Sequence, residues 1–172
     1  MGFISLGALA SVVVFLHPPI PQPQAYHHFA DARTFLGVPN SLNVLSNFGF
    51  LIVGIWGLFV VANRVEASER VPYFVLFIGI LLTAFGSAYY HWSPSNARLV
   101  WDRLPMTFGF MGLFAAFMGE RIGPAWRRWF LWPLVATGIG SVAYWYWSET
   151  HGHGDLRLYI LVQFSRLWES YS

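Results

Sequence analysis

The feature that most constrains this chain is a series of apolar runs separated by short polar connections. The runs cover 2–16, 41–63, 72–91, 99–119, 126–147 and 156–164. An α-helix needs roughly 20 apolar residues to cross about 30 Å of hydrocarbon, and the four middle runs have about that length. Because the connections between these four are short, consecutive helices are expected to be antiparallel neighbours.

The composition indicates the same class of protein. Only 10% of the residues are charged and 56% are hydrophobic, whereas a soluble domain carries about 25% charged residues. We therefore predict an all-α fold, a polytopic transmembrane helix bundle with about five spans, of which the short first run would be one. All ten basic residues are arginines scattered along the chain, which argues against a nucleic-acid partner, because nucleic-acid binding requires clustered basic residues. There is no cysteine, so any metal would be bound by histidines and carboxylates.

Three segments are expected. Residues 1–23 form an N-terminal hydrophobic anchor followed by a proline-rich segment. We favour an uncleaved anchor over a signal peptide, because no basic residue precedes the apolar run and no small-residue cleavage site follows it. Residues 24–165 form the transmembrane domain, and 166–172 form a divergent polar tail.

One pair of run ends carries the residues best suited to chemistry. Ser87 and His91 are four residues apart at the end of one run, so they share a helix face. Asp102 lies at the start of the next run, and the loop 92–98 between them is short. The two helix ends must therefore lie at the same membrane surface, which brings Ser87, His91 and Asp102 into one pocket. Ionisable residues at membrane depth are costly and usually mark function.

These residue types are compatible with two mechanisms. In a Ser-His-Asp system the histidine activates the serine and the aspartate orients the histidine. In a hydrolytic metal site the histidine binds zinc and the aspartate handles protons of the zinc-bound water. Catalytic zinc requires about three protein ligands and a water, so the spacing alone does not choose between them. A purely structural role for His91 near the headgroups, and for Asp102 at a helix N-terminus, stays open as well.

The remaining polar residues are expected to be structural. Asn43 and Asn47 are four residues apart and are expected to hydrogen-bond to neighbouring helices, with a place in the same pocket as the alternative. Four histidines are expected on solvated loops rather than in a metal site: His27, His28, His151 and His153. No glycine-rich nucleotide-binding pattern is present between a strand and a helix.

At the pocket residues the chain resembles the alkaline ceramidase family, which belongs to a wider group of membrane hydrolases that includes the adiponectin receptors. Ser-Leu-Asn-Val-Leu-Ser-Asn at 41–47 looks like the first core helix of that family. Phe-Gly-Ser-Ala-Tyr-Tyr-His at 85–91 looks like its second, and Trp-Asp-Arg-Leu-Pro-Met at 101–106 like the start of its third. Residues 26–40 are similar to the plant and bacterial ceramidase-like branch.

The resemblance implies a fold of seven core helices and a function in sphingolipid metabolism. In this family a zinc-bound water attacks the amide carbonyl of ceramide and releases a sphingoid base and a fatty acid. The matching positions imply that His91 is a zinc ligand, that Asp102 orients or deprotonates the water, and that Ser87 helps to stabilise the oxyanion. The protein would be an integral membrane protein, located in the endoplasmic reticulum or Golgi if the source is eukaryotic.

The chain also departs from the family pattern. The family's other two zinc ligands come from a His-x-x-x-His pair on its last core helix, and nothing here matches that pair. Only four of the seven core helices are recognisable, so we expect a C-terminally truncated chain. The alternative to a ceramide amidase is therefore a catalytically inactive membrane protein that binds lipid or associates with a full-length relative or other membrane proteins. Asn40 stands where some members have a calcium-binding glutamate, so calcium binding is not expected.

Overall fold

The computed structural model describes residues 14–164, and this part of the chain is helical, as predicted. The only pairing of β type within it is an isolated bridge between Phe35 and Val38. The helices are η1 (Gln24–His27, a 3-10 turn), α2 (Ser41–Ser46), α3 (Phe48–Arg64), α4 (Arg70–Trp92), α5 (Asn96–Arg121), α6 (Pro124–Thr150) and α7 (Arg157–Phe164). Most of the expected N-terminal anchor, and the whole of the expected tail 166–172, lie outside the described residues.

Each long apolar run became a helix that extends slightly beyond the run. Polar residues at the ends explain the extension of α5, where the Ser95 hydroxyl accepts a hydrogen bond from the Arg98 backbone N–H at 3.3 Å and caps the helix. At the start of α6, Pro124 occupies the first turn, where the missing N–H of proline costs nothing. The apolar runs therefore located the helices, and local chemistry set where α5 and α6 begin.

Two helical stretches are long and apolar enough to cross a membrane. They are Ser41–Arg64, which joins α2 and α3 over 24 residues, and α4 with 23 residues. No further helix within residues 14–164 meets both conditions. With 26 and 27 residues, α5 and α6 also exceed the roughly 20 residues that a span requires, but both carry more charged residues than the other two, and α6 is also rich in Trp and Tyr. The number of five spans therefore stays a prediction.

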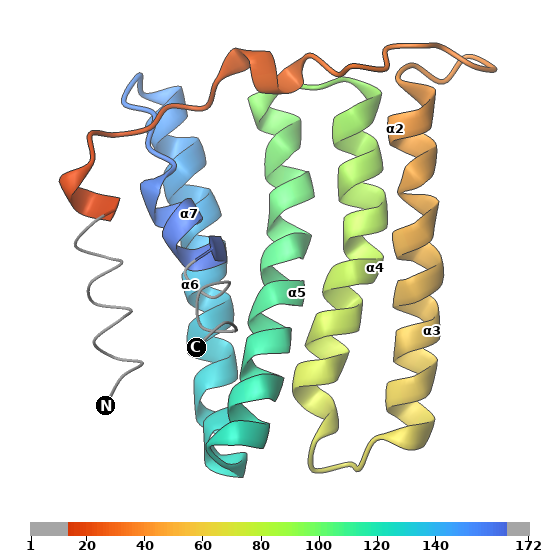
Figure 1. Cartoon of the computed structure of the whole chain (residues 1–172), viewed down its shortest axis with the longest axis vertical. Coiled ribbons are helices and arrows are strands. Elements are labelled where there is room, and N and C mark those ends of the chain that lie inside the picture. The colour runs from red at the N-terminus through yellow and green to blue at the C-terminus, as the bar shows by residue number, and fades with distance from the viewer. Residues whose placement is uncertain (1–13, 165–172) are drawn as a thin grey trace.

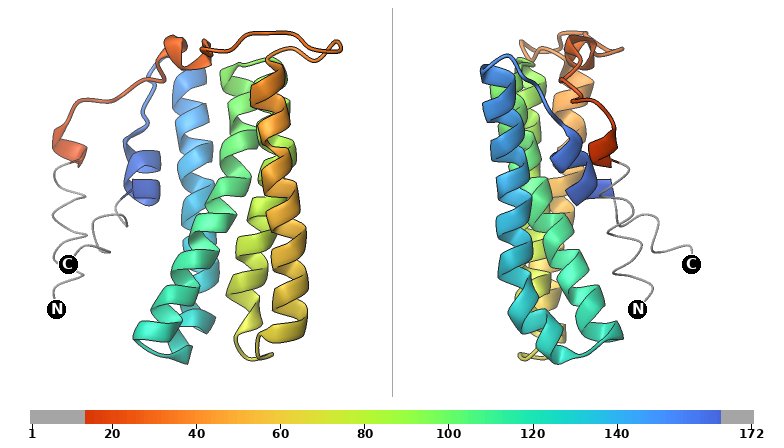
Figure 2. Two further views of the ribbon diagram at one scale, coloured as in Figure 1. Left: turned by 45° about the vertical axis from the view of Figure 1, so that its right-hand side comes forward. Right: turned by 90° about the vertical axis from the view of Figure 1, so that its left-hand side faces the viewer.

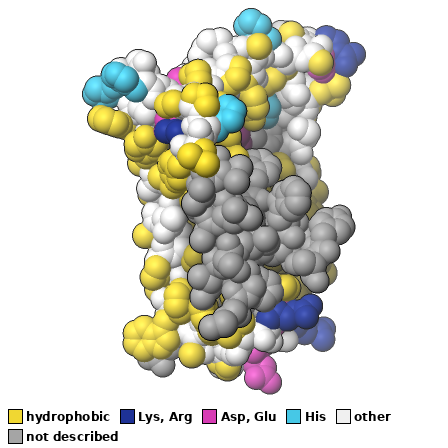
Figure 3. Space-filling model, turned by 60° about the vertical axis from the view of Figure 1, so that its left-hand side comes forward, with side chains coloured by type: hydrophobic (Ala, Val, Ile, Leu, Met, Phe, Trp, Pro, Cys, Tyr) yellow, Lys and Arg dark blue, Asp and Glu magenta, His cyan; other side chains and the backbone are white. Residues whose placement is uncertain are grey.

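The four long helices α3, α4, α5 and α6 run side by side, each antiparallel to the next, and α7 packs beside α6 (Figures 1 and 2). The segment 18–40, here called the N-terminal strap, crosses one end of the bundle from α6 to α2 (Figure 1). On the face drawn in Figure 3, the visible charged side chains lie toward the two ends of the molecule, and the visible histidines lie toward one of them.

The backbones of α4 and α5 approach each other closely at glycines. A Cβ atom at Gly86 would lie 1.9 Å from the Trp101 carbonyl oxygen, and one at Gly79 would lie 2.3 Å from the Gly109 backbone nitrogen. Neither position can hold a side chain unless the helices separate. Small residues at such contacts are the usual means of packing helices in membranes, so these glycines set the distance across which the candidate site is built.

Replacing Gly86 with alanine should therefore destabilise the bundle. The added methyl group meets backbone rather than a flexible side chain, and we expect a loss of about 3 kcal/mol in the free energy of unfolding. Thermal unfolding in detergent measures the effect. The matched control is Gly49→Ala on α3, because nothing lies within 4 Å of a Cβ atom there and alanine favours the helix. Equal unfolding temperatures for the two variants would show that the α4–α5 contact is looser than described.

The N-terminal strap is bound to the bundle by specific polar contacts. His27 Nδ1 lies 2.9 Å from the Tyr90 hydroxyl of α4, and its Nε2 lies 2.8 Å from Asn96 Oδ1 of α5. The prediction of a solvated His27 was therefore wrong, because both ring nitrogens are used to bridge two helices. The expected exposure of the other three loop histidines is confirmed for His28, His151 and His153.

A second set of contacts ties residues 17–20, at the start of the strap, to the loop after α6 and the first residue of α7. The Leu156 backbone N–H donates to the Ile20 carbonyl at 2.8 Å, and the Arg157 guanidinium donates to the His17 carbonyl at 2.6 Å. Arg157 also forms an ion pair with the buried carboxylate of Asp155, at 2.8 Å. This hydrogen-bonded pairing lowers the pKa of Asp155 below its ordinary value, so the ion pair holds at neutral pH.

Candidate functional site

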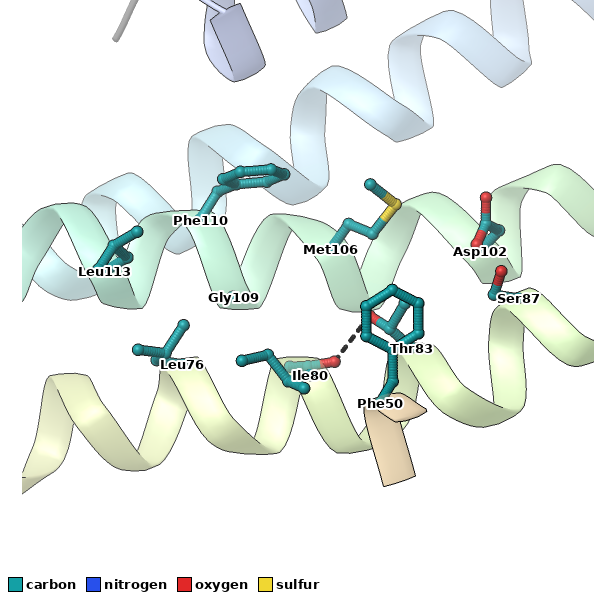
Figure 4. Close-up of a pocket in the computed structure, with 11 residues that line it drawn as sticks. Phe50, Leu76, Ile80, Thr83, Ser87, Asp102, Met106, Gly109, Phe110 and Leu113 are labelled. Carbon is teal, nitrogen blue, oxygen red and sulfur yellow. Dashed lines mark hydrogen bonds between the residues drawn. The ribbon is translucent and has the colours of Figure 1, made fainter. Parts of the chain in front are cut away.

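A groove of about 430 Å³ runs between α4 and α5 and is bordered by α3 (Figure 4). Its lining is apolar over most of its length and polar at one end. The lining residues are Phe50, Leu76, Gly79, Ile80, Thr83, Ser87, Asp102, Met106, Gly109, Phe110 and Leu113. The side chains of Phe50, Phe110 and Leu113 are between 42% and 50% exposed, so the groove is open along the side of the bundle. Its volume lies within the range that is usual for small-molecule sites.

The spacing of the lining residues gives the groove its length. On α4 they extend from Leu76 to Ser87, and on α5 from Asp102 to Leu113. Each stretch advances by 11 residues, which corresponds to roughly 16 Å along a helix. One leaflet of a bilayer contributes about 15 Å of hydrocarbon. The groove is therefore about as long as one leaflet is thick.

Ser87 and Asp102 form the polar end of the groove, and their side chains point toward one another across the α4–α5 contact (Figure 4). The Ser87 residue is 6% exposed. The sequence predicted that Ser87, His91 and Asp102 lie in one pocket; Ser87 and Asp102 both line the groove, whereas His91 does not. The close approach of the helix backbones at Gly86 and Trp101, one residue away from each, holds the two side chains together.

His91 lies one helical turn beyond Ser87 and does not line the groove. It is close enough to Asp102 for their charges to interact. The Phe29 ring of the strap packs against the His91 ring with a centroid distance of 4.7 Å. His91 Nδ1 is buried and has no hydrogen-bond partner among the described residues. A buried polar atom without a partner is unusual, so this nitrogen is the one feature of His91 that its contacts with the described residues do not explain.

Next to Asp102 in the chain, Arg103 points away from the groove into a buried aromatic cluster. Its guanidinium carbon lies 4.1 Å from the centre of the Trp145 ring and 4.5 Å from that of Tyr159. Its Nη2 donates to Gln22 Oε1 of the strap at 2.7 Å, and the residue is 6% exposed. The sequence analysis did not single out Arg103 or Gln22. An arginine within an apolar run was the available signal, because such a residue has to find a protein partner.

The two asparagines of the first long helix have roles different from those predicted. Asn47 Nδ2 donates to the Asn43 carbonyl of its own helix at 2.8 Å, and Asn43 Nδ2 donates to the Asp31 carbonyl of the strap at 2.9 Å. Among the described residues, neither side chain bonds to a neighbouring long helix, and neither lines the groove. The prediction failed because the strap, which folds back over α2, accepts the Asn43 amide, while the Asn47 amide turns back to carbonyls of its own helix.

The side chains near His91 and Asp102 determine whether the described residues can hold a catalytic zinc. Zinc requires about three protein ligands and an open position. Within residues 14–164 no group of three or more His, Asp and Glu side chains is placed so that it could hold a metal ion. His91 and Asp102 are two candidate ligands, and no third His, Asp or Glu side chain within residues 14–164 is placed so that the three could hold a metal ion. The described residues therefore do not by themselves complete a zinc site.

The apolar wall of the groove was not anticipated from the sequence, although a periodic signal exists. The α4 lining positions Leu76, Gly79, Ile80 and Thr83 lead to Ser87 at intervals of three, one, three and four residues. Such spacing defines one helix face. In a helix that is apolar on all sides, however, this face is indistinguishable from the others until its neighbour is known.

Comparison with known protein families gives a match. The family model described as Ceramidase matches residues 38–170 of this chain, which is most of its length and includes the whole groove with Ser87, His91 and Asp102. No curated protein matches the chain, and no solved structure matches it.

Proposed function

Because the chain belongs to the ceramidase family, we propose that it hydrolyses the amide bond of ceramide-type lipids in a membrane, giving a sphingoid base and a fatty acid. The observation that carries the proposal is the groove that ends at Ser87 and Asp102. A lipid amide has a polar centre attached to long alkyl chains. The groove offers a polar end of two suitable side chains and an apolar wall as long as one leaflet.

The position of the groove favours a substrate that enters from the membrane. The strap covers the ends of the helices on the side of the polar residues (Figure 1), whereas the apolar wall is open along the side of the bundle through Phe110 and Leu113. An alkyl chain can therefore enter sideways without leaving lipid. The amide group would then lie near the membrane surface, beside Asp102.

The two polar side chains suit amide hydrolysis. The Asp102 carboxylate accepts a proton from a water that attacks the amide carbonyl and passes it to the amine nitrogen as the C–N bond breaks, and positioned acid–base groups of this kind contribute about 10²–10⁴-fold to a rate. The Ser87 hydroxyl donates a hydrogen bond to the oxygen on which negative charge develops. Donors already oriented toward that oxygen stabilise the transition state. Both groups approach the same point of the groove from opposite helices.

We also propose His91 as a metal ligand. Members of the ceramidase family are generally metal-dependent, and His91 has a buried ring nitrogen with no partner among the described residues. Zinc binding by this protein requires ligands in addition to those that residues 14–164 bring near His91. The metal content of the purified protein, compared between the wild type and His91→Gln, tests this assignment. An equal metal content in the two proteins would exclude His91 as a ligand.

The function is tested with the purified full chain in detergent or in phosphatidylcholine vesicles. Ceramide labelled in its acyl chain is supplied, and the release of labelled fatty acid is measured. The expected result is release that depends on Asp102. An absence of release from any ceramide, by protein that unfolds cooperatively on heating, would reject the proposed activity.

A second candidate function is lipid binding without hydrolysis, by this protein alone or in association with a full-length relative or another membrane protein. The incomplete set of metal donors within the described residues favours it, while the groove itself supports both functions. This alternative would be supported if the purified protein bound labelled ceramide, released no fatty acid and contained no metal.

A further inference from the structure

Two glycines face each other across the middle of the groove and differ in what a side chain would meet there. A Cβ atom on Gly79 would collide with the backbone of Gly109, at 2.3 Å from its nitrogen. A Cβ atom on Gly109 would have a single neighbour, the Leu76 carbonyl oxygen, at an ordinary contact distance of 3.8 Å. Helix packing therefore explains the glycine at position 79 and does not explain the one at position 109.

The space beside Gly109 belongs to the groove. Gly109 lines it together with Ile80 and Phe110 (Figure 4). The position lies seven residues after Asp102, which is roughly 10 Å along α5. A methyl group there would narrow the groove between its polar end and its far apolar end at Leu76 and Leu113. It would leave the polar end and the α4–α5 contact unchanged.

We propose that Gly109 determines the length of alkyl chain that the groove accepts. The inference rests on the proposed lipid substrate and adds a residue that selects among substrates. Short chains end before Gly109 and do not depend on it, whereas long chains pass over the glycine and pack against Leu76 and Leu113. A missing or extra methyl group in an apolar site changes selectivity by about 10–200-fold, so a single methyl group at this position is a sufficient barrier.

The test compares the wild type with Gly109→Ala. In the full chain, hydrolysis is measured for a series of ceramides whose acyl chain is lengthened at constant sphingoid base, and for a second series in which the base is lengthened instead. We expect Gly109→Ala to lower the rate ratio of the longest to the shortest substrate by about tenfold or more in one series. An equal change for all lengths in both series would overturn the proposal.

The matched control is Gly140→Ala on α6, where nothing lies within 4 Å of an added Cβ atom and the position is exposed. It adds the same methyl group to a helix outside the groove, and its length preference should equal that of the wild type. Thermal unfolding should be unchanged or slightly raised in both variants, because alanine replaces glycine within a helix. A large loss of stability in Gly109→Ala alone would contradict the open space described here.

A second readout does not require turnover. Ceramides with a diazirine at the distal end of the acyl chain or of the sphingoid base are irradiated with the protein, and the labelled peptides are mapped. Labelling of Leu76, Phe110 or Leu113 in the wild type, reduced in Gly109→Ala, supports the proposal even if no ceramide is hydrolysed. Labelling elsewhere only, or labelling of these residues that is equal in the two proteins, overturns it.

Discussion

Asp102→Asn should abolish most of the hydrolysis of ceramide by this protein, with a loss of roughly 10²–10⁴-fold in rate. Asparagine keeps the shape of the side chain at the polar end of the groove but cannot accept a proton from the attacking water. Ser87→Ala should cost about 10²-fold, because one donor to the developing oxyanion is lost. Release of labelled fatty acid under saturating ceramide measures both effects.

The matched control for the charge change is Glu66→Gln, in the loop between α3 and α4. Glu66 is exposed and lies at the opposite end of the bundle from the groove's polar end, so its replacement should leave the rate unchanged. Binding of the photoreactive ceramide should persist in Asp102→Asn, since the apolar wall is intact. If Asp102→Asn retains the wild-type rate, this carboxylate does not take part in the chemistry.

The second large effect concerns stability and involves Arg103. Arg103→Ala should lower the free energy of unfolding by about 2–5 kcal/mol, which is the range for deleting a large buried side chain. The substitution removes the stacking on Trp145 and Tyr159 and leaves the buried amide of Gln22 without its partner. Thermal unfolding in detergent measures the loss, and proteolysis near Gln22 should become faster because the strap is less firmly held.

Arg98→Ala is the control for this prediction. Arg98 lies on the same helix and also stacks on an aromatic ring, that of Tyr89 at 4.4 Å, but it is only half-buried and its hydrogen bond to the Tyr89 carbonyl is exposed. Exposed cation–π contacts contribute about 0.5–1 kcal/mol, so the loss should be small. Arg103→Met separates the effect of lost side-chain volume on stability from the effect of lost charge. Methionine fills much of the space without the cost of burying a cation. A wild-type unfolding temperature in Arg103→Ala would show that the buried cluster does not stabilise the protein.

The positions of the helices and the neighbourhood of Ser87, His91 and Asp102 could be predicted because they depend on short-range patterns. Apolar runs of about 20 residues form helices wherever they are placed in lipid, and the observed bounds differ from the runs by only a few residues. The loop between α4 and α5 is too short to allow anything but adjacent ends. The motifs around these three residues also predicted the family, which the match over 38–170 confirms.

The strap could not be predicted, because its contacts join residues far apart in the chain. His27 is bound to Tyr90 and Asn96, more than sixty residues away, and Gln22 is bound to Arg103. In the sequence His27 and Gln22 belong to a polar, proline-rich stretch that is typical of solvated loops. Only the path of the chain over the end of the bundle buries them.

By itself, the sequence determined that the chain is helical, which residues lie at the shared end of α4 and α5, and to which family the chain belongs. The tertiary structure decided that these residues end an open apolar groove, that Arg103 points away from it, and that Gly79 and Gly109 have different roles. The physical reason is the rotation of each helix about its axis. A helix that is apolar on all sides carries no periodic signal for its packed face, so that face is fixed only when a neighbouring helix makes contact with it.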